Sequence, residues 1–149
     1  MLTDIYSRRI LELAAAIPRL GRLPDADASA SAHSRLCGST VTVDVKIEDG
    51  RVIDFAHEVR ACALGQASSS IMGRNVLGST AAELRAVRDE TRRMLQEGGA
   101  PPGGRWSDLG ALEPVRDFKA RHASILLTFD AVVDAIAQVE AARRPVVPT

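Results

Sequence analysis

Alternating apolar and polar residues mark two strands in the middle of the chain. Residues 40–48 (TVTVDVKIE) and 51–59 (RVIDFAHEV) show the two-residue period of half-buried strands rich in β-branched side chains. Asp49-Gly50 between them is typical of a two-residue turn, so an antiparallel hairpin is predicted. The alternation divides the second strand into one face with Val52, Asp54, Ala56 and Glu58 and another with Ile53, Phe55, His57 and Val59.

A stretch of small residues precedes this hairpin and has two interpretations. Residues 25–34 (DADASASAHS) have the composition of a linker, but their alternation also fits an edge strand with small inward side chains. The sequence favours neither interpretation.

Apolar residues at helical spacing predict several helices around these strands. The predicted helices run from Thr3 to Ile17, from Ala63 to about Val76, from Thr80 to about Gln96, and from Val115 or Asp117 to Ala142. Thr80 and Glu83 have the spacing of a capping box. A flexible break is predicted at residues 98–104, followed by a loop in which Trp106, Leu109 and Leu112 contact the core.

The order of these elements predicts an α+β fold. Strands come first and helices later, so we expect a small antiparallel sheet of about three strands with helices packed on one face. The break at residues 98–104 is not a domain boundary, because neither side of it has a full core. Residues 1–149 are therefore predicted to form one domain with a frayed tail from about residue 143.

Composition excludes several classes of protein. The chain of 149 residues has 19 Lys and Arg and 19 Asp and Glu, so bulk charge does not predict binding to nucleic acid or to anionic lipid. No apolar run approaches the roughly 20 residues that span a bilayer, and the amino-terminal residues lack the apolar core of a signal peptide. We therefore expect a cytoplasmic protein with no membrane and no nucleic-acid partner.

The two cysteines are predicted to lie close together. Cys37 precedes the first hairpin strand and Cys62 follows the second, and these positions meet at one end of an antiparallel pair. Cys62 also precedes a helix, whose dipole favours a thiolate. The alternative is that both cysteines are ordinary small buried residues, as most are in intracellular domains.

Histidines and serines near the cysteines have open interpretations. His33 and His122 either turn toward the thiols or lie elsewhere, and His57 is expected in the core or at a sheet edge. The serines at 68–70 are expected to be a closely packed helix face, since no nucleophile elbow accompanies them.

The chain resembles the iron–sulfur cluster assembly scaffolds of the IscU/SufU type, also called the NifU N-terminal domain. The motifs that carry the resemblance are Tyr6, the segment Ile17-Pro18-Arg19-Leu20-Gly21, Cys37-Gly38, Cys62 with Ala67-Ser68-Ser69-Ser70, Gly78-Ser79-Thr80, and the region from Leu109-Gly110 to Arg121, which is similar to an insertion of the SufU branch. The resemblance implies a site of three cysteines with an Asp or His that holds a nascent cluster or zinc. It also implies that the site receives sulfur from a cysteine desulfurase.

Two ligands of that family pattern are missing here. Ser39 stands where the family has Asp, and the third cysteine aligns with Ala123 in an IscU-like register or Ser124 in a SufU-like register. His122 matches the histidine before that cysteine in IscU-like proteins. The resemblance therefore implies Cys37 and Cys62 as cluster-binding residues, and Cys37, Cys62 and His122 as metal ligands.

Three functions are compatible with this reduced ligand set. The first is a scaffold or carrier, not an enzyme, with a cluster such as [2Fe–2S] shared by a homodimer and partners that include a cysteine desulfurase and recipient apoproteins. The second is a SufU-like sulfur relay that contains zinc. The third is a degenerate paralogue that acts as an interaction module.

Overall fold

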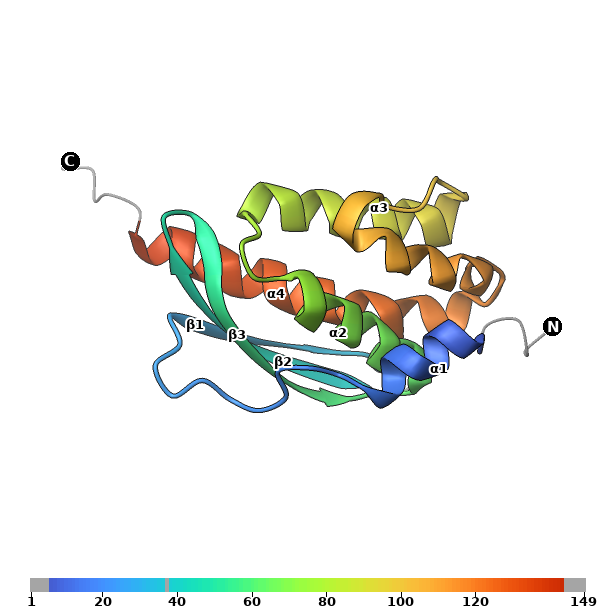
Figure 1. The fold of residues 1–149 in the computed structure, drawn as a ribbon, viewed down its shortest axis with the longest axis horizontal. Helices are drawn as coiled ribbons and strands as arrows, with labels where there is room; N and C mark the ends of the chain where they lie inside the picture. Colours follow the sequence, from blue (N-terminus) through green and yellow to red (C-terminus); the bar gives the residue numbers. More distant parts are fainter. Residues whose placement is uncertain (1–5, 37, 144–149) are drawn as a thin grey trace.

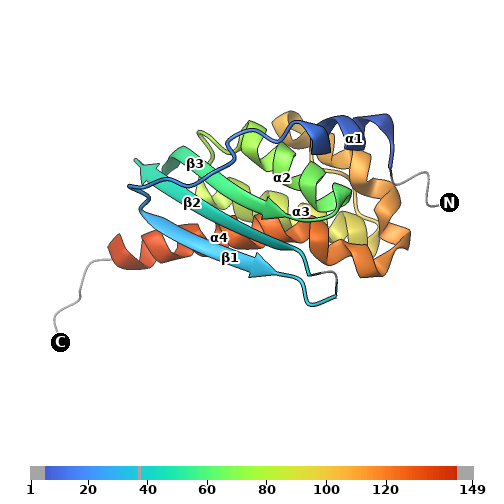
Figure 2. The same ribbon diagram turned by 90° about the horizontal axis from the view of Figure 1, so that it is seen from below.

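The computed structural model describes residues 6–36 and 38–143. The elements in order are α1 (Arg8–Ala15), β1 (Ala28–His33), β2 (Thr40–Glu48), β3 (Arg51–Arg60), α2 (Ala63–Asn75), α3 (Ala81–Glu97), the 3₁₀ segments η2 (Gly104–Asp117) and η3 (Lys119–Arg121), and α4 (His122–Arg143). The strands pair antiparallel in the order β1-β2-β3, and the helices cover one face of the sheet (Figures 1 and 2). The predicted α+β class is confirmed.

The core lies between the sheet and the helical layer. Val41, Val43 and Val45 of β2 are buried under α4, which also crosses β1. The stretch at 25–34 contains this edge strand, and its inward residues are small, Ala30 being only 7% exposed. Small side chains on β1 let the long α4 lie close against the sheet.

The two faces of β3 differ from those predicted, because the strand contains a β-bulge. Lys46 pairs with Asp54 but Ile47 pairs with Val52, so Ile53 is the extra residue. Val52 and Phe55 therefore both face the core at 1% exposure, whereas Ile53 is 43% exposed. The prediction that Ile53 shares a face with Phe55 was wrong, because one inserted residue reverses the alternation. The turn at Asp49-Gly50 is present as predicted, with φ values of 52° and 75°.

The first helix begins later than predicted. Ser7 caps α1, its Oγ accepting a hydrogen bond from the amide of Ile10 at 3.3 Å. The predicted cap, Thr3, lies outside the described residues, but the helix itself starts only at Arg8. The predicted helices at α2 and α3 are confirmed, and Thr80 caps α3 by accepting from the amide of Glu83 at 3.2 Å.

The segment predicted as a loop after the break is a 3₁₀ helix. Trp106, Leu109, Leu112 and Val115 are all buried and recur every third residue along η2. Because a 3₁₀ helix has three residues per turn, this spacing places them on one side. Because this 3₁₀ segment extends to Asp117, α4 begins only at His122 and not at Val115 or Asp117 as predicted.

A buried carboxylate anchors the segment that crosses the outer face of the sheet. Asp44 accepts from Arg22 Nε at 2.7 Å, from the Leu23 amide at 2.9 Å, and from the Ser29 hydroxyl. Burial alone would raise the pKa of Asp44, but these hydrogen bonds outweigh it and lower the pKa to about 2. The segment between α1 and β1 is therefore held against β2 by a charged group.

The carboxyl end of the described chain is fixed to the sheet. Arg143, the last residue of α4, donates to the carbonyl of Ile47 at 2.9 Å. Residues 144–149 of the predicted frayed tail lie outside the described residues, and the single domain stays a prediction. None of the described helices combines the length and apolarity needed to cross a membrane.

Candidate cluster site

Cys62 lies at the junction between the sheet and α2. It is the N-cap residue of α2, with φ −68° and ψ 173°, and its thiol makes no capping hydrogen bond. Arg60, the last residue of β3, pairs with Thr40, which also pairs with His33 at the end of β1. The loop 34–39 and Cys62 are therefore at one end of the sheet.

The loop 34–39 is closed by two backbone hydrogen bonds. The amide of Ser34 donates to the carbonyl of Ser39, and the amide of Gly38 donates to the carbonyl of Ser34, both at 2.9 Å. Gly38 has a φ of +70°, a conformation that favours glycine. Cys37 lies outside the described residues, so its part in the site stays a prediction.

A cavity of about 340 Å³ brings three chain segments together around Cys62. Among the described residues, its lining consists of Leu36, Cys62, Ala120, Arg121 and Ser124. Leu36, the neighbour of Cys37, is 77% exposed at its rim. Arg121 donates to the Tyr6 hydroxyl at 3.0 Å. A half-buried thiol thus shares a small cavity with the guanidinium group of Arg121.

Close packing between α2 and α4 sets the position of Ser124. A Cβ added at Gly65 would lie 3.1 Å from the carbonyl oxygen of Ser124 and 2.7 Å from Ala61 Cβ. One turn on, the Ser68 hydroxyl donates to the Ile125 carbonyl at 2.7 Å. The serines at 68–70 are all buried, as expected of a closely packed helix face, and Ser68 joins α2 to the start of α4.

Of the two positions that align with the missing third cysteine, Ser124 lines the cavity of Cys62. Ala123 instead lines a different cavity, on the other side of the first turn of α4. The position that aligns with the third cysteine in the SufU-like register therefore lines the same cavity as Cys62.

His122 is directed away from Cys62. Its Nε2 lies 3.0 Å from the carbonyl oxygen of Val115 and 3.1 Å from that of Arg116. Because carbonyls only accept, Nε2 carries the hydrogen and the lone pair of the neutral ring is on Nδ1. His122 lines the same separate cavity as Ala123.

The other histidines also lie apart from the cavity of Cys62. His33 Nδ1 lies 2.9 Å from the Thr40 hydroxyl, and its ring lines the separate cavity. His57 is buried in the core, where Nε2 donates to the Pro18 carbonyl at 2.8 Å. Its core position agrees with the expectation for this residue.

The described residues alone do not form a complete metal site. Within residues 6–36 and 38–143, no three His, Cys, Asp or Glu side chains are placed to hold one ion. A thiolate is the ligand that iron–sulfur clusters and zinc prefer. A cluster or zinc ion at Cys62 would therefore need at least one further thiolate, from Cys37 or from a partner. Arg121 and Leu36, which line the cavity, were not predicted, although each directly adjoins a predicted ligand.

Comparison with known proteins identifies the family of this chain. Residues 5–110 match the family described as NifU-like N terminal domain. The chain belongs to this family. It is similar to the crystal structure of a nitrogen-fixing NifU-like protein (N-terminal) from Brucella abortus, with 63% identity, a TM-score of 0.92, and coverage of 94% of this chain and 97% of that one.

Two other similar proteins have lower sequence identity to this chain. The iron–sulfur cluster assembly scaffold protein IscU of Thermotoga maritima is 26% identical over 135 residues, which are 91% of this chain and 94% of that protein. A putative scaffold protein for the SUF system from Fervidobacterium islandicum shares the fold at 21% identity and a TM-score of 0.81, covering 89% of this chain and 96% of that one. These two relatives are named as scaffold proteins and not as enzymes.

Proposed function

We propose that this chain is an iron–sulfur cluster assembly scaffold or carrier in which Cys37 and Cys62 bind the cluster. The observation that carries the proposal is the cavity where Cys62 and Leu36, the neighbour of Cys37, lie together. Family membership supports it, because the Thermotoga relative is named as such a scaffold. The protein would bind and transfer its cargo without a turnover reaction of its own.

The number of thiolates favours a shared cluster. Clusters are normally held by about four thiolates, and the chain has two cysteines. A homodimer would pool the thiols of both chains around one [2Fe–2S] cluster. In the described orientation only Nδ1 of His122 is open to a metal, since its Nε2 is occupied by two carbonyls, and the ring lines a different cavity from Cys62. As a ligand beside Cys62, His122 would have to give up these hydrogen bonds.

The partners follow from the cargo. A cysteine desulfurase would supply sulfur, and recipient apoproteins in the cytoplasm would take up the cluster. The exposed Leu36 offers such proteins an apolar contact at the rim of the cavity.

A zinc-containing sulfur relay is the second candidate, and the position of Ser124 favours it. Ser124, which aligns with the third cysteine in the SufU-like register, lines the same cavity as Cys62. In a relay, the Cys62 thiolate would attack the outer sulfur of a desulfurase persulfide, and the desulfurase cysteine would leave as a thiolate. In this candidate the site would hold a zinc ion in place of a cluster, and no sulfide would be bound.

Cysteine variants test the scaffold. After reconstitution with iron and sulfide without oxygen, the native chain should show sulfur-to-iron charge-transfer bands. Cys37→Ser and Cys62→Ser should each lose most of the bound iron and sulfide, because a hydroxyl is a poor ligand for iron in a cluster. Ala120→Ser is the matched control, since it adds a hydroxyl to the same cavity and leaves both thiols.

Unchanged iron and sulfide in both cysteine variants would contradict the scaffold. Stoichiometric zinc without sulfide, with sulfur accepted from a desulfurase, would favour the relay. If the native chain holds neither iron nor zinc, only the third function, an interaction module, remains.

A further inference from the structure

The hydroxyl of Ser34 is buried without a partner close to the candidate site. Ser34 is 4% exposed, and its Oγ has no hydrogen-bond partner in the described structure. Burying a hydroxyl without a partner costs folding free energy, so such groups are rare in native proteins. A bound ligand that brings a hydrogen-bond acceptor would satisfy this hydroxyl.

Backbone pairing places Ser34 on the helix side of the sheet. Its amide donates to the carbonyl of Ser39 at 2.9 Å, which continues the pairing of β1 with β2 by one further step. His33 and Arg35 on either side of Ser34 are exposed, as alternation along a strand requires. Ser34 therefore has the same orientation as Ala30 of β1, which faces the core.

Ser34 also closes the loop that contains Cys37. Its amide donates to the carbonyl of Ser39, and its carbonyl accepts from the amide of Gly38, so both of its backbone polar groups are used. A serine side chain at the start of a loop often accepts from a backbone amide a few residues on. In the described structure the hydroxyl makes no such bond, so its hydrogen is available to a ligand.

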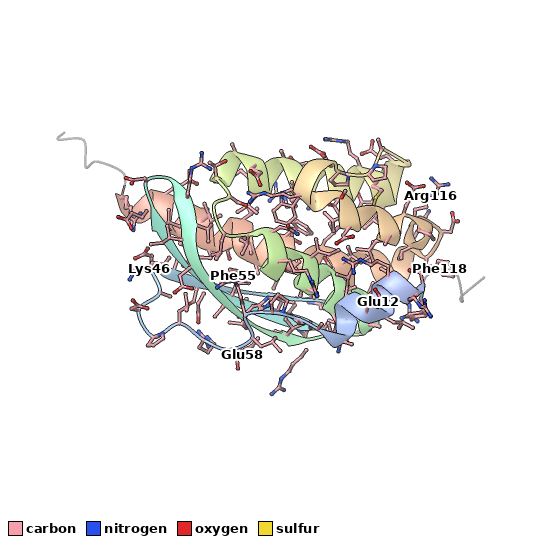
Figure 3. All side chains as sticks on the ribbon, viewed as in Figure 1. Glu12, Lys46, Phe55, Glu58, Arg116 and Phe118 are labelled. Atoms are coloured by element: carbon pink, nitrogen blue, oxygen red, sulfur yellow. The ribbon has the colours of Figure 1, made fainter. Side chains whose placement is uncertain are left out.

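The loop 34–39 and the cavity of Cys62 lie at one end of the molecule. Leu36, two residues after Ser34, lines that cavity together with Cys62. Figure 3 shows Phe118, which directly precedes η3, at the end of the molecule opposite Lys46 of β2. The residues of η3 that line the cavity therefore lie at the end where β2 begins, next to the loop.

The other unpartnered hydroxyls in the described chain have a simpler explanation. They belong to Ser69 of α2 and Thr128 of α4, both of which are buried. A serine or threonine inside a helix reaches the carbonyl of residue i−4 when its side chain rotates. Ser34 lies outside the described helices and has no such carbonyl.

Sulfur is the acceptor that the proposed function would bring to this place. The thiolates and sulfides of a cluster are negatively charged, and a hydrogen bond to a charged acceptor is stronger than one to a neutral acceptor. Hydrogen bonds to the sulfurs also tune the electronic properties of a cluster. A neutral serine hydroxyl supplies such a bond without competing with the thiolates for iron.

We propose that the Ser34 hydroxyl donates a hydrogen bond to a sulfur atom of the cluster bound at Cys37 and Cys62. This role rests on the proposed scaffold function. Ser34 is then a hydrogen-bond donor to the cargo and not a ligand of iron. Its hydroxyl has no partner in the protein without a cluster and gains one when the cluster binds.

Ser34→Ala, reconstituted with iron and sulfide without oxygen, tests this role. The variant should still load the cluster, because both thiols remain. Its sulfur-to-iron charge-transfer bands should move to longer wavelength, since a hydrogen bond stabilises the sulfur electrons that these bands excite. Iron should pass to EDTA about fivefold faster than from the native protein, as expected for the loss of one hydrogen bond.

Ser69→Ala is the matched control, because it removes another buried hydroxyl that has no partner in the described structure. Its charge-transfer bands and its rate of iron loss should equal those of the native chain. Urea unfolding without a cluster should show no loss of stability in either variant, because no hydrogen bond is broken there.

Four results would overturn the role of Ser34. Unchanged bands and iron loss in loaded Ser34→Ala would overturn it and leave the scaffold standing. Equal changes in Ser69→Ala would assign the effect to packing. Lower stability of Ser34→Ala without a cluster, or failure to fold, would show that the hydroxyl already has a partner. A native chain that loads no cluster would overturn the scaffold itself, and the role of Ser34 with it.

Discussion

His57 is buried in the core without a partner for one of its nitrogens. Nε2 donates to the Pro18 carbonyl, and Nδ1 has no hydrogen-bond partner in the described structure. Burial lowers the pKa of His57, although the Pro18 carbonyl acts in the opposite direction. The ring is therefore neutral in the folded protein at neutral pH. It packs edge-on against Phe55, with the two ring centroids 4.9 Å apart.

This neutral histidine predicts a loss of stability in mild acid. Above the ordinary pKa of about 6.5 neither state carries the proton, so His57 has no effect on the pH dependence. As pH falls below that value, the unfolded chain takes up a proton that the folded chain resists. The free energy of unfolding then falls by at most about 1.4 kcal/mol per pH unit, until the pH reaches the lower pKa that His57 has in the folded protein.

Urea unfolding at pH 7.5 and 5.5 measures this loss. His57→Gln keeps a donor for Pro18 and removes the titration, so its free energy of unfolding should fall less over the interval. His33→Gln makes the same replacement at an exposed position and is the matched control. Equal losses in all three proteins would contradict the account of His57.

At the scale of elements, the contact between α2 and α4 positions the site. Gly65 has no room for a Cβ, because Ala61 and the Ser124 carbonyl lie within 3.1 Å of that position. The helix contact therefore depends on the absence of a side chain. Cys62 begins one of these helices and Ser124 lies in the first turn of the other.

Gly65→Ala tests this contact. An alanine is ordinarily favoured over glycine inside a helix by roughly 1 kcal/mol. Here we expect a net loss of about 1–3 kcal/mol in thermal or urea unfolding, because overpacking must push α4 away. Gly110→Ala is the control, since its Cβ would meet only Pro101 at 3.4 Å. A Gly65→Ala protein more stable than the native chain would contradict the close packing.

The sequence predicted regular elements well and irregular ones poorly. Alternation located β2 and β3, but the bulge was hidden because Val52 and Ile53 are both apolar and either can face the core. The spacing of Trp106, Leu109 and Leu112 fits a 3₁₀ helix, yet such long 3₁₀ segments are uncommon and a loop was expected. Local pattern does not specify either feature.

On the scale of the whole molecule, the site lies where distant parts of the chain meet at one end of the sheet. The antiparallel hairpin was enough to predict that the loop 34–39 and Cys62 share that end. The direction of His122 could not be predicted, because it depends on where η2 ends and which carbonyls it leaves for the ring. Tertiary packing, not spacing, decided which residue of α4 faces Cys62.

The proposed cluster would be held by two thiols of each chain, and its presence can be measured in the purified native protein. The protein is purified without oxygen, and iron, zinc and acid-labile sulfide are measured per chain together with the native mass. We predict about one iron and one sulfide per chain in a dimer, as a shared [2Fe–2S] cluster requires. A chain that holds neither iron nor sulfide, even after reconstitution, would contradict the account.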